Sequence, residues 1–465
     1  MSKFARINEQ IGRYRWTICA LVFFATTINY IDRNVLGLLK PMLSDEGVFG
    51  PDKAAQELNY ANVVMCFQAA YAVGMLLAGR FIDWLGTKSG YAYALLGWSF
   101  AAIGHAFGHH TWSFGFWRAA LGLAEAGNFP AANKTIAEWF PRRERALATG
   151  LYNSGANVGA IVAPLSVPYI AEAWGWEWAF VLTGAIGLLW LVFWYRTYDS
   201  PAAKLQKGQL GQAEYAHIHS DPDEATASAV APVRWWRLLG FRQTWSFALG
   251  KFLTDPVWWF YLFWLPSFLD DENARKVADY VAANPGFTGD ASTVPGYISW
   301  PLAVAVIYLI STAGSVFGGW LPKYFVQRGR DVNRARKLAM FLFALAPLSV
   351  LLASRLGRID IWLAVLTIGV ATAAHQAWSA NIFTTVSDMF PKRAVASVTG
   401  IGGMAGAIGG ILIARAAGVL LAHFADQGQI EVGYGVMFVI CGSAYVLAWV
   451  VMHLLAPKFE LVKLD

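Results

Sequence analysis

Apolar stretches of about twenty residues recur along most of the chain and alternate with short segments rich in charge, Gly or Pro. About 20 apolar residues are what an α-helix needs to cross the hydrocarbon core of a bilayer. We therefore predict an all-α membrane protein with twelve transmembrane helices. The expected centres of these spans are Phe24, Tyr71, Gly97, Gly122, Gly159, Gly187, Phe260, Leu309, Leu345, Gly369, Gly409 and Ala444.

The composition agrees, because 57% of the residues are hydrophobic and only 14% are charged, against roughly 25% in soluble domains. Lys and Arg, including Arg13, Arg15 and the 142–145 cluster, gather in alternate polar segments, which places both termini in the cytoplasm. The net charge of +6 therefore reports topology and predicts no nucleic-acid partner. We expect a plasma-membrane protein, in the inner membrane if the source is Gram-negative, with a first span that is retained rather than cleaved.

The chain divides into two halves of six spans. Residues 198–243 form a long polar stretch, which we interpret as a cytoplasmic linker between a bundle at 1–197 and a second at 244–465. The segment Glu138-Trp139-Phe140-Pro141-Arg142-Arg143 recurs 250 positions later as Asp388-Met389-Phe390-Pro391-Lys392-Arg393. The register continues into the next span, so the two bundles are predicted to be an internal repeat.

Four charged residues lie inside predicted spans: Asp32, Arg33, Arg118 and Glu125. A charge at such a depth costs roughly 2.5 to 3.5 kcal/mol, so these residues are expected to pair or to act. Arg118 and Glu125 are two helical turns apart, about 10.5 Å, so each must look to another helix. One arrangement places Asp32 or Arg33 against their shared face. The alternative is a static salt-bridge network that only fixes helix packing.

Uncharged polar residues mark two further spans. Asn153 and Asn157 share a helix face and could bond sugar hydroxyls or a neighbouring backbone, with Asn157 the better site candidate. His375, Trp378 and Asn381 form a stripe that suits a polyol. His375 could titrate, form neutral hydrogen bonds or be structural.

Other features point to packing rather than chemistry. Lys251 and Asp255 are four apart and are expected to neutralise each other, and the glycines between 400 and 410 are expected to allow close helix contact. No hydrolase, metalloprotease or nucleotide-loop motif is found, so we predict no enzyme activity, no cofactor and no metal site.

A loop motif, Gly79-x-x-x-Asp83-x-x-Gly86-x-Lys88, resembles the signature of the major facilitator superfamily, with Trp84 in place of the usual basic residue. The glycines are expected to permit close helix approach and a tight turn. Asp83 would accept bonds from a helix N-terminus or a cytoplasmic Arg, in a structural or gating role. The resemblance covers the whole chain, and in that superfamily the substrate binds near the midplane.

Three segments narrow the resemblance to the anion:cation symporter family, especially its hexuronate and aldonate transporters. They are Asn29-Tyr30-Ile31-Asp32-Arg33-Asn34, the Arg118 to Glu125 spacing, and Trp378-Ser379-x-Asn381 with Ser387 to Pro391. The resemblance implies proton coupling at Asp32 and Glu125 and anion contact by Arg33. It also implies that Arg118 holds or releases Glu125 and that Tyr30 and Tyr71 line the site. Thr254-Asp255-Pro256 departs from members with a basic residue there, which weakens transfer to glutamate transport.

We therefore expect a monomeric transporter in the lipid bilayer that imports a sugar acid, a hexuronate such as galacturonate or glucuronate. Transport would occur by proton symport through alternating access. The alternatives are a carrier or exchanger of an aldonate, glucarate or a dicarboxylate, and a membrane ligand sensor that does not transport. Against the sensor, neither terminus is long enough for an output domain.

Overall fold

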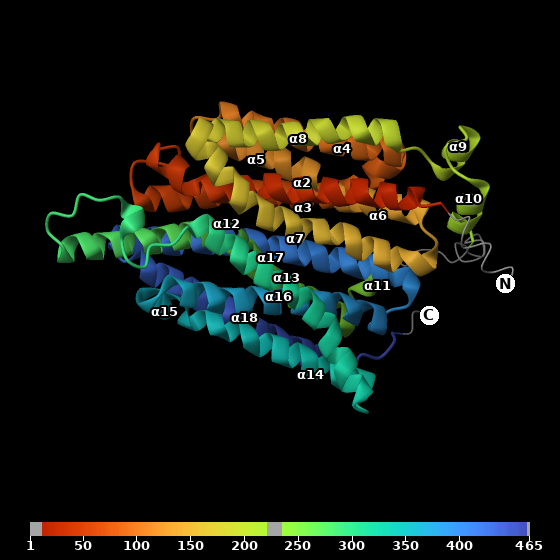
Figure 1. Cartoon of the computed structure of the whole chain (residues 1–465). Coiled ribbons are helices and arrows are strands. Elements are labelled where there is room, and N and C mark those ends of the chain that lie inside the picture. Colours follow the sequence, from red (N-terminus) through yellow and green to blue (C-terminus); the bar gives the residue numbers. More distant parts are fainter. Residues whose placement is uncertain (1–11, 221–234, 463–465) are drawn as a thin grey trace, which may run out of the picture. The chain divides into compact units, whose positions relative to one another are not determined.

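The computed structural model describes residues 12–220 and 235–462, and these residues are almost wholly helical, without strands (Figure 1). The helices before the predicted linker are α2 (Tyr14–Asp45), α3 (Lys53–Leu85), α4 (Thr87–Gly104), α5 (Thr111–Glu125), α6 (Asn128–Trp139), α7 (Arg142–Trp174) and α8 (Trp176–Thr197). Those after it are α12 (Arg242–Ala283), α13 (Trp300–Gln327), α14 (Val332–Leu345), α15 (Ala353–Ile359), α16 (Ile361–Met389), α17 (Lys392–Asp426) and α18 (Ile430–Leu455).

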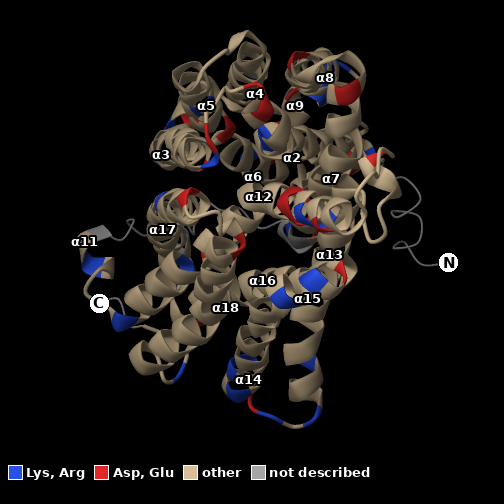
Figure 2. Cartoon of the chain, turned by 90° about the vertical axis from the view of Figure 1, so that its left-hand side faces the viewer, with Lys and Arg blue, Asp and Glu red and all other residues tan. Residues whose placement is uncertain are grey.

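Each predicted span centre lies in a helix, and the all-α membrane fold is confirmed. Among the described residues, eight helical segments are long and apolar enough to cross a membrane. The predicted spans outside this set are α2, α4 and α12, together with α5, which has only 15 residues. Figure 2 shows most of the ribbon free of charged residues.

The predicted linker contains the short helices α9 (Pro201–Gln206), α10 (Gln212–Ile218) and α11 (Trp235–Leu238), while its residues 221–234 lie outside the described part. The division at 198–243 stays a prediction. Contacts define two compact units with other bounds. The first unit holds the described residues up to Val35, Ala69–Ala163 and 170–220, and the second holds Leu36–Gln68, Pro164–Tyr169 and the described residues from 235 onward.

In the first unit, α4 packs against α5, α6 and α8. Helix α7 meets α2 through glycines: a Cβ at Gly155 or Gly159 would lie 2.5 Å from the carbonyl oxygen of Phe23 or Thr27 respectively. No side chain larger than hydrogen fits at that spacing, so the two backbones touch. This contact fixes the part of α2 that carries Tyr30 and Arg33.

In the second unit, α17 packs along α12 through its glycines. Side chains at Gly402 and Gly406 would clash with Phe247 and Asp255, and one at Gly409 would clash with the carbonyl oxygen of Phe252. That carbonyl lies four residues before Pro256, which has no N–H to donate to it. The predicted packing role of this glycine stripe is confirmed at these three positions.

The second unit also contains the turn between α2 and α3. A Cβ at Gly37 would lie 3.2 Å from the carbonyl oxygen of Leu262, four residues before Pro266. The hydroxyl of Tyr60 donates to the next carbonyl, that of Phe263, at 2.8 Å. A proline in α12 thus again leaves a carbonyl without its helical donor, and neighbouring helices cover that region.

Candidate functional site

The centre of the candidate site in the first unit is an ion pair between Arg33 of α2 and Glu125 at the end of α5. The Nε and Nη2 atoms of Arg33 lie 2.9 and 2.8 Å from Oε2 of Glu125, and both residues are buried. Nη2 also donates to Oδ1 of Asn29, one turn earlier, at 3.3 Å. The sequence left open whether Asp32 or Arg33 faces the side of α5 that carries Glu125, and in the structure it is Arg33.

Two tyrosines flank the guanidinium. The Arg33 Cζ atom lies 4.9 Å from the ring centroid of Tyr30 on its own helix and 4.9 Å from that of Tyr71 on α3. Aromatic faces attract a guanidinium within about 6 Å. The structure thus brings together four of the predicted site residues, Tyr30, Arg33, Tyr71 and Glu125.

Arg118 is fully buried on α5 and donates from Nη2 to the backbone carbonyl of Arg33 at 2.9 Å. This bond braces the α2 backbone at the residue that pairs with Glu125. The predicted switch between Arg118 and Glu125 is not the ion pair recorded here, because the ion-pair partner of Glu125 is Arg33. Arg118 lies two turns before Glu125 on the same element and reaches across to α2 instead.

Asp32 is 2% exposed, and neither carboxylate oxygen has a hydrogen-bond partner among the described residues. Thr183 of α8 lies beside it, but the Thr183 hydroxyl donates to the Phe180 carbonyl at 3.4 Å. The second oxygen of Glu125, Oε1, also lacks a partner within the described ranges. A buried carboxylate without a partner is expensive as an anion. Of these two buried acids, Glu125 is therefore paired with Arg33, whereas Asp32 has no hydrogen-bond partner among the described residues.

In the second unit, His375 and Trp378 of α16 pack around Tyr445 of α18. Nδ1 of His375 lies 2.6 Å from the Tyr445 hydroxyl, and its ring stacks on Trp258 of α12 with centroids 4.9 Å apart. The Trp378 ring meets Tyr445 edge to face at 5.8 Å. Its indole nitrogen is buried with no hydrogen-bond partner in the described chain.

Asn381 is also buried on α16, but its amide nitrogen donates to the carbonyls of Gly318 at 2.8 Å and Ala377 at 2.9 Å. Its NH₂ group thus ties α16 to α13. Asn157 lies half-buried on α7 in the first unit. Lys251 and Asp255 form the predicted neutral pair, with Nζ to Oδ2 at 2.7 Å.

The loop motif between α3 and α4 is only partly as predicted. Gly86 has φ of +78°, which confirms the tight turn. Asp83 accepts a bond from Lys134 of α6 at 2.7 Å, rather than from an Arg or a helix N-terminus. The close helix approach predicted at Gly79 is not seen among the described residues and stays a prediction.

Comparison with known proteins decides the family. Residues 22–414 match the model of the Major Facilitator Superfamily. The chain belongs to this superfamily.

Relatives of this transporter include three bacterial proteins. It is 28% identical to the hexuronate transporter of Escherichia coli K12 over 89% of both chains. It is 29% identical to a D-galactonate transporter of Escherichia coli O6:H1 over 88% of this chain and 90% of the relative. It is 30% identical to the galacturonate transporter of Dickeya chrysanthemi over 72% of this chain and 90% of the relative. These relatives are transporters and not enzymes. They support the prediction that this chain is a transporter and not an enzyme.

Solved structures agree on the fold. A D-xylose-proton symporter superposes with a TM-score of 0.69 at 15% identity, covering 96% of this transporter and 99% of the symporter. A bacterial homolog of the human lysosomal transporter Spinster superposes with a TM-score of 0.67 at 16% identity, covering 96% and 97%. The transporter is therefore a multi-pass membrane protein of this fold.

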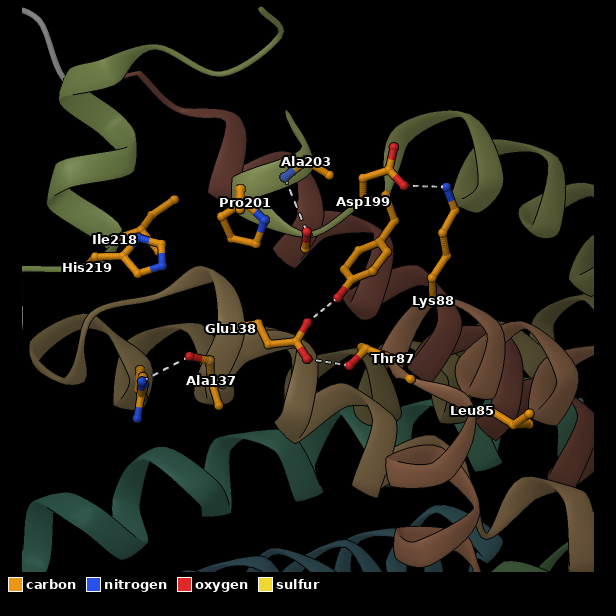
Figure 3. Close-up of a pocket in the computed structure, with 15 residues that line it drawn as sticks. Leu85, Thr87, Lys88, Ala137, Glu138, Asp199, Pro201, Ala203, Ile218 and His219 are labelled. Carbon is orange, nitrogen blue, oxygen red and sulfur yellow. Dashed lines mark hydrogen bonds and ion pairs between the residues drawn. The ribbon is translucent and has the colours of Figure 1, made fainter. Parts of the chain in front are cut away.

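A separate pocket of about 660 Å³ lies where the start of the predicted linker meets the α3–α4 and α6–α7 turns (Figure 3). Glu138 accepts bonds of 2.5 Å from both Thr87 and Tyr198, and Lys88 pairs with Asp199 at 2.7 Å. Burial alone would raise the pKa of Asp199. The bonds from Lys207 and Lys88 outweigh this effect and lower the pKa of Asp199 below its ordinary value. Of the predicted site residues, Gly86 lines this pocket. Lys88 and Asp199 neutralise each other there, whereas Arg145 donates to the backbone carbonyls of Phe140 and Ala137.

Sequence reasoning missed a second buried ion pair, between Lys40 and Glu57, at 2.5 Å. Lys40 is near the end of the first apolar run and Glu57 near the start of the second, so both resembled span ends. Their opposite charges at the two ends of a short turn were the sequence signal that could have indicated this pair. It also missed Tyr445, the partner of His375, which has no polar neighbour in the sequence to mark it.

Proposed function

We propose that this transporter imports a sugar acid, a hexuronate such as galacturonate or glucuronate, together with protons by alternating access. The observation that carries the proposal is the buried Arg33 between two tyrosine rings, with Glu125 as its ion-pair partner. A guanidinium binds a carboxylate through two parallel hydrogen bonds. The relatives, which are transporters of hexuronate, galacturonate and D-galactonate, supply the substrate class.

Protonation of Glu125 is the proposed coupling step. While Glu125 is ionised, its Oε2 occupies the Nε and Nη2 donors of Arg33. A proton on Glu125 weakens that pair and leaves the guanidinium for the substrate carboxylate. Arg118 keeps the backbone of Arg33 in place during this exchange through its bond to the carbonyl. Proton and anion binding then favour each other.

Asp32 is the second proposed proton carrier. It is buried without a hydrogen-bond partner among the described residues, whereas Arg33, the next residue, is already paired. A buried unpaired carboxylate is stabilised by gaining a proton.

The hydroxyls of the sugar are assigned to neutral polar groups. His375, held by Tyr445, and the indole of Trp378 supply hydrogen-bonding groups, and Asn157 is half-buried in α7. The amide nitrogen of Asn381 is engaged by two carbonyls, so its oxygen is the available atom of that side chain. We further propose cytoplasmic termini, from the distribution of Lys and Arg, and function as a monomer in the bilayer.

The test is uptake of radiolabelled glucuronate or galacturonate into proteoliposomes, with and without an inward proton gradient. The gradient should accelerate uptake into vesicles that contain the wild type, and empty vesicles provide the baseline. Absence of gradient-driven uptake of both hexuronates contradicts the proposal.

Glu125→Gln separates a symporter from an exchanger. Gln is isosteric and cannot take up a proton, so gradient-driven uptake should fall at least tenfold, while counterflow exchange of preloaded substrate survives. An exchanger without proton coupling would lose both activities equally. Galactonate and glucarate in the same vesicles test the alternative acids.

A further inference from the structure

Gln68 of α3 is a buried amide whose hydrogen-bonding capacity is unused. The side chain is 2% exposed, and neither its oxygen nor its nitrogen has a hydrogen-bond partner among the described residues. Buried side-chain amides are nearly always bonded, because each unsatisfied polar group costs about 1 to 3 kcal/mol. Gln68 can donate two bonds and accept two.

The surroundings of Gln68 lie within the second unit. A Cβ at Gly410 of α17 would lie 3.4 Å from Nε2 of Gln68, and 3.1 and 3.4 Å from Cδ1 and Nε1 of Trp259 of α12. The amide and the polar edge of an indole therefore converge on a residue with no side chain. Trp259 is half-exposed, whereas Gln68 and Gly410 are buried, so this point borders the surface of the packed core.

The polar groups of the second unit already proposed for the substrate are partly engaged within the protein. Asn381 donates to two backbone carbonyls, and Nδ1 of His375 is taken by Tyr445. Within the same unit, Trp259 follows Trp258, whose ring stacks on that of His375 with centroids 4.9 Å apart.

We propose that Gln68 is a specificity-determining residue that hydrogen-bonds a hydroxyl of the substrate through its side-chain amide. A hydroxyl both donates and accepts, which matches an amide with both atoms unengaged. A site that bonds a substrate hydroxyl through a buried group rejects an analogue without that hydroxyl, because the group is left unpaired. This inference rests on the proposed transport of a polyhydroxy acid.

The test compares uptake of hexuronate with inhibition by analogues that each lack one hydroxyl. Gln68→Met keeps the length of the side chain and removes the amide. In the wild type, one deoxy analogue should inhibit more weakly than the others. In Gln68→Met, the KM for the hexuronate should rise about 2- to 10-fold, the equivalent of one hydrogen bond, and the penalty for that analogue should disappear.

The matched control is Gln56→Met, on the same helix. Gln56 donates to the carbonyls of Ser44 at 3.0 Å and Gly50 at 3.3 Å, which is a structural role. This variant should lose thermal stability and keep the wild-type discrimination among analogues. Gln68→Asn, which retains the amide on a shorter side chain, provides a second variant if Gln68→Met does not fold.

Two results would overturn the inference. If Gln68→Met transports hexuronate with wild-type discrimination among the analogues, or if Gln68→Asn, which shortens the reach of the amide, leaves both the KM and the discrimination unchanged, Gln68 is structural. If the wild type transports hexuronate but is inhibited equally by every deoxy analogue, no single substrate hydroxyl is recognised by a buried amide. Absence of uptake of hexuronate, galactonate and glucarate by the wild type is a different failure, since it removes the proposed function and the inference together.

Discussion

Lys40 and Glu57 are buried side chains whose charges depend on each other. Lys40 is 2% exposed and Glu57 0%, and Nζ lies 2.5 Å from Oε1 of Glu57. The other oxygen of Glu57 accepts from the indole of Trp264 at 3.3 Å, and Nζ also lies 4.7 Å from the ring of Tyr60. Removing one partner of such a pair leaves an uncompensated buried charge.

We expect Lys40→Met to lower the free energy of unfolding by about 3 to 5 kcal/mol, the usual penalty for breaking a buried pair. Lys40→Met combined with Glu57→Gln should recover most of that loss, because no unpaired charge remains. The measurement is the melting temperature of the purified transporter in detergent. A double variant no more stable than Lys40→Met alone would show that the charges do not interact.

Arg33 differs from Lys40 in what surrounds its charge. Its guanidinium has a carboxylate, an amide oxygen and two aromatic rings around it. A planar guanidinium can exchange one carboxylate partner for another, because its donors form a fixed fork. This geometry explains why the proposed substrate anchor is an Arg and the structural pair contains a Lys.

At the scale of helices, α12 and α17 touch along a stripe of glycines. A side chain at Gly409 would collide with the Phe252 carbonyl, whereas one at Gly400 would meet no described atom within 4 Å. Glycine within a helix is also less favourable than alanine by about 1 kcal/mol. Replacement of glycine by alanine should therefore destabilise the transporter at position 409 but not at position 400.

Gly409→Ala should lower the melting temperature of the transporter, because α12 and α17 must separate to admit the methyl group. Gly400→Ala is the matched control and should leave the melting temperature unchanged or raise it. Equal effects at both positions would mean that the contact between these helices is not tight.

The sequence predicts the helices better than the contacts between them. Apolar runs locate every span centre, whereas the division into two halves stays a prediction. The four charges at Asp32, Arg33, Arg118 and Glu125 stand out by their cost alone. Which of them pair depends on helix rotation and tilt, which periodicity does not supply, so Arg33 rather than Arg118 emerged as the ion-pair partner of Glu125 only from the structure.

Some residues give no sequence signal. Gln68 and Gln56 lie on the same helix, yet Gln68 has no hydrogen-bond partner in the part of the chain that the structure describes, whereas Gln56 donates to two carbonyls. Asn381 belongs to a stripe that suits a polyol but is used to join two helices. The same side chain can bind substrate or backbone, and only the position of the neighbouring helix decides between these roles.

For the whole molecule, a polar cluster outside the spans ties three segments together. Glu144 at the start of α7 accepts from Arg15 of α2 at 2.8 Å and lies 2.8 Å from Nε2 of His217 of α10. Burial alone would raise the pKa of Glu144, but the bonds to Arg15 and His217 outweigh it and lower the pKa below the ordinary range of a glutamate. The folded state therefore holds this proton less tightly than the unfolded state.

The sign of the pH effect follows from this difference. The stabilisation by Glu144 is complete above the ordinary glutamate range and is lost as the pH falls through the lowered pKa of the folded state. The melting temperature of the wild type should exceed that of Glu144→Gln near neutral pH, and the gap should close on acidification. Glu172→Gln, at an exposed position of α7, should show no such gap. A gap that does not change with pH would contradict the assignment.

The two prolines of α12 have a consequence for motion. Pro256 and Pro266 each leave a carbonyl without its helical donor, and Gly409 and Gly37 lie against those carbonyls. A neighbour that moves away from such a carbonyl breaks no bond within α12, and water can solvate the exposed oxygen. The interruptions in this helix are thus places where other helices can leave and return reversibly.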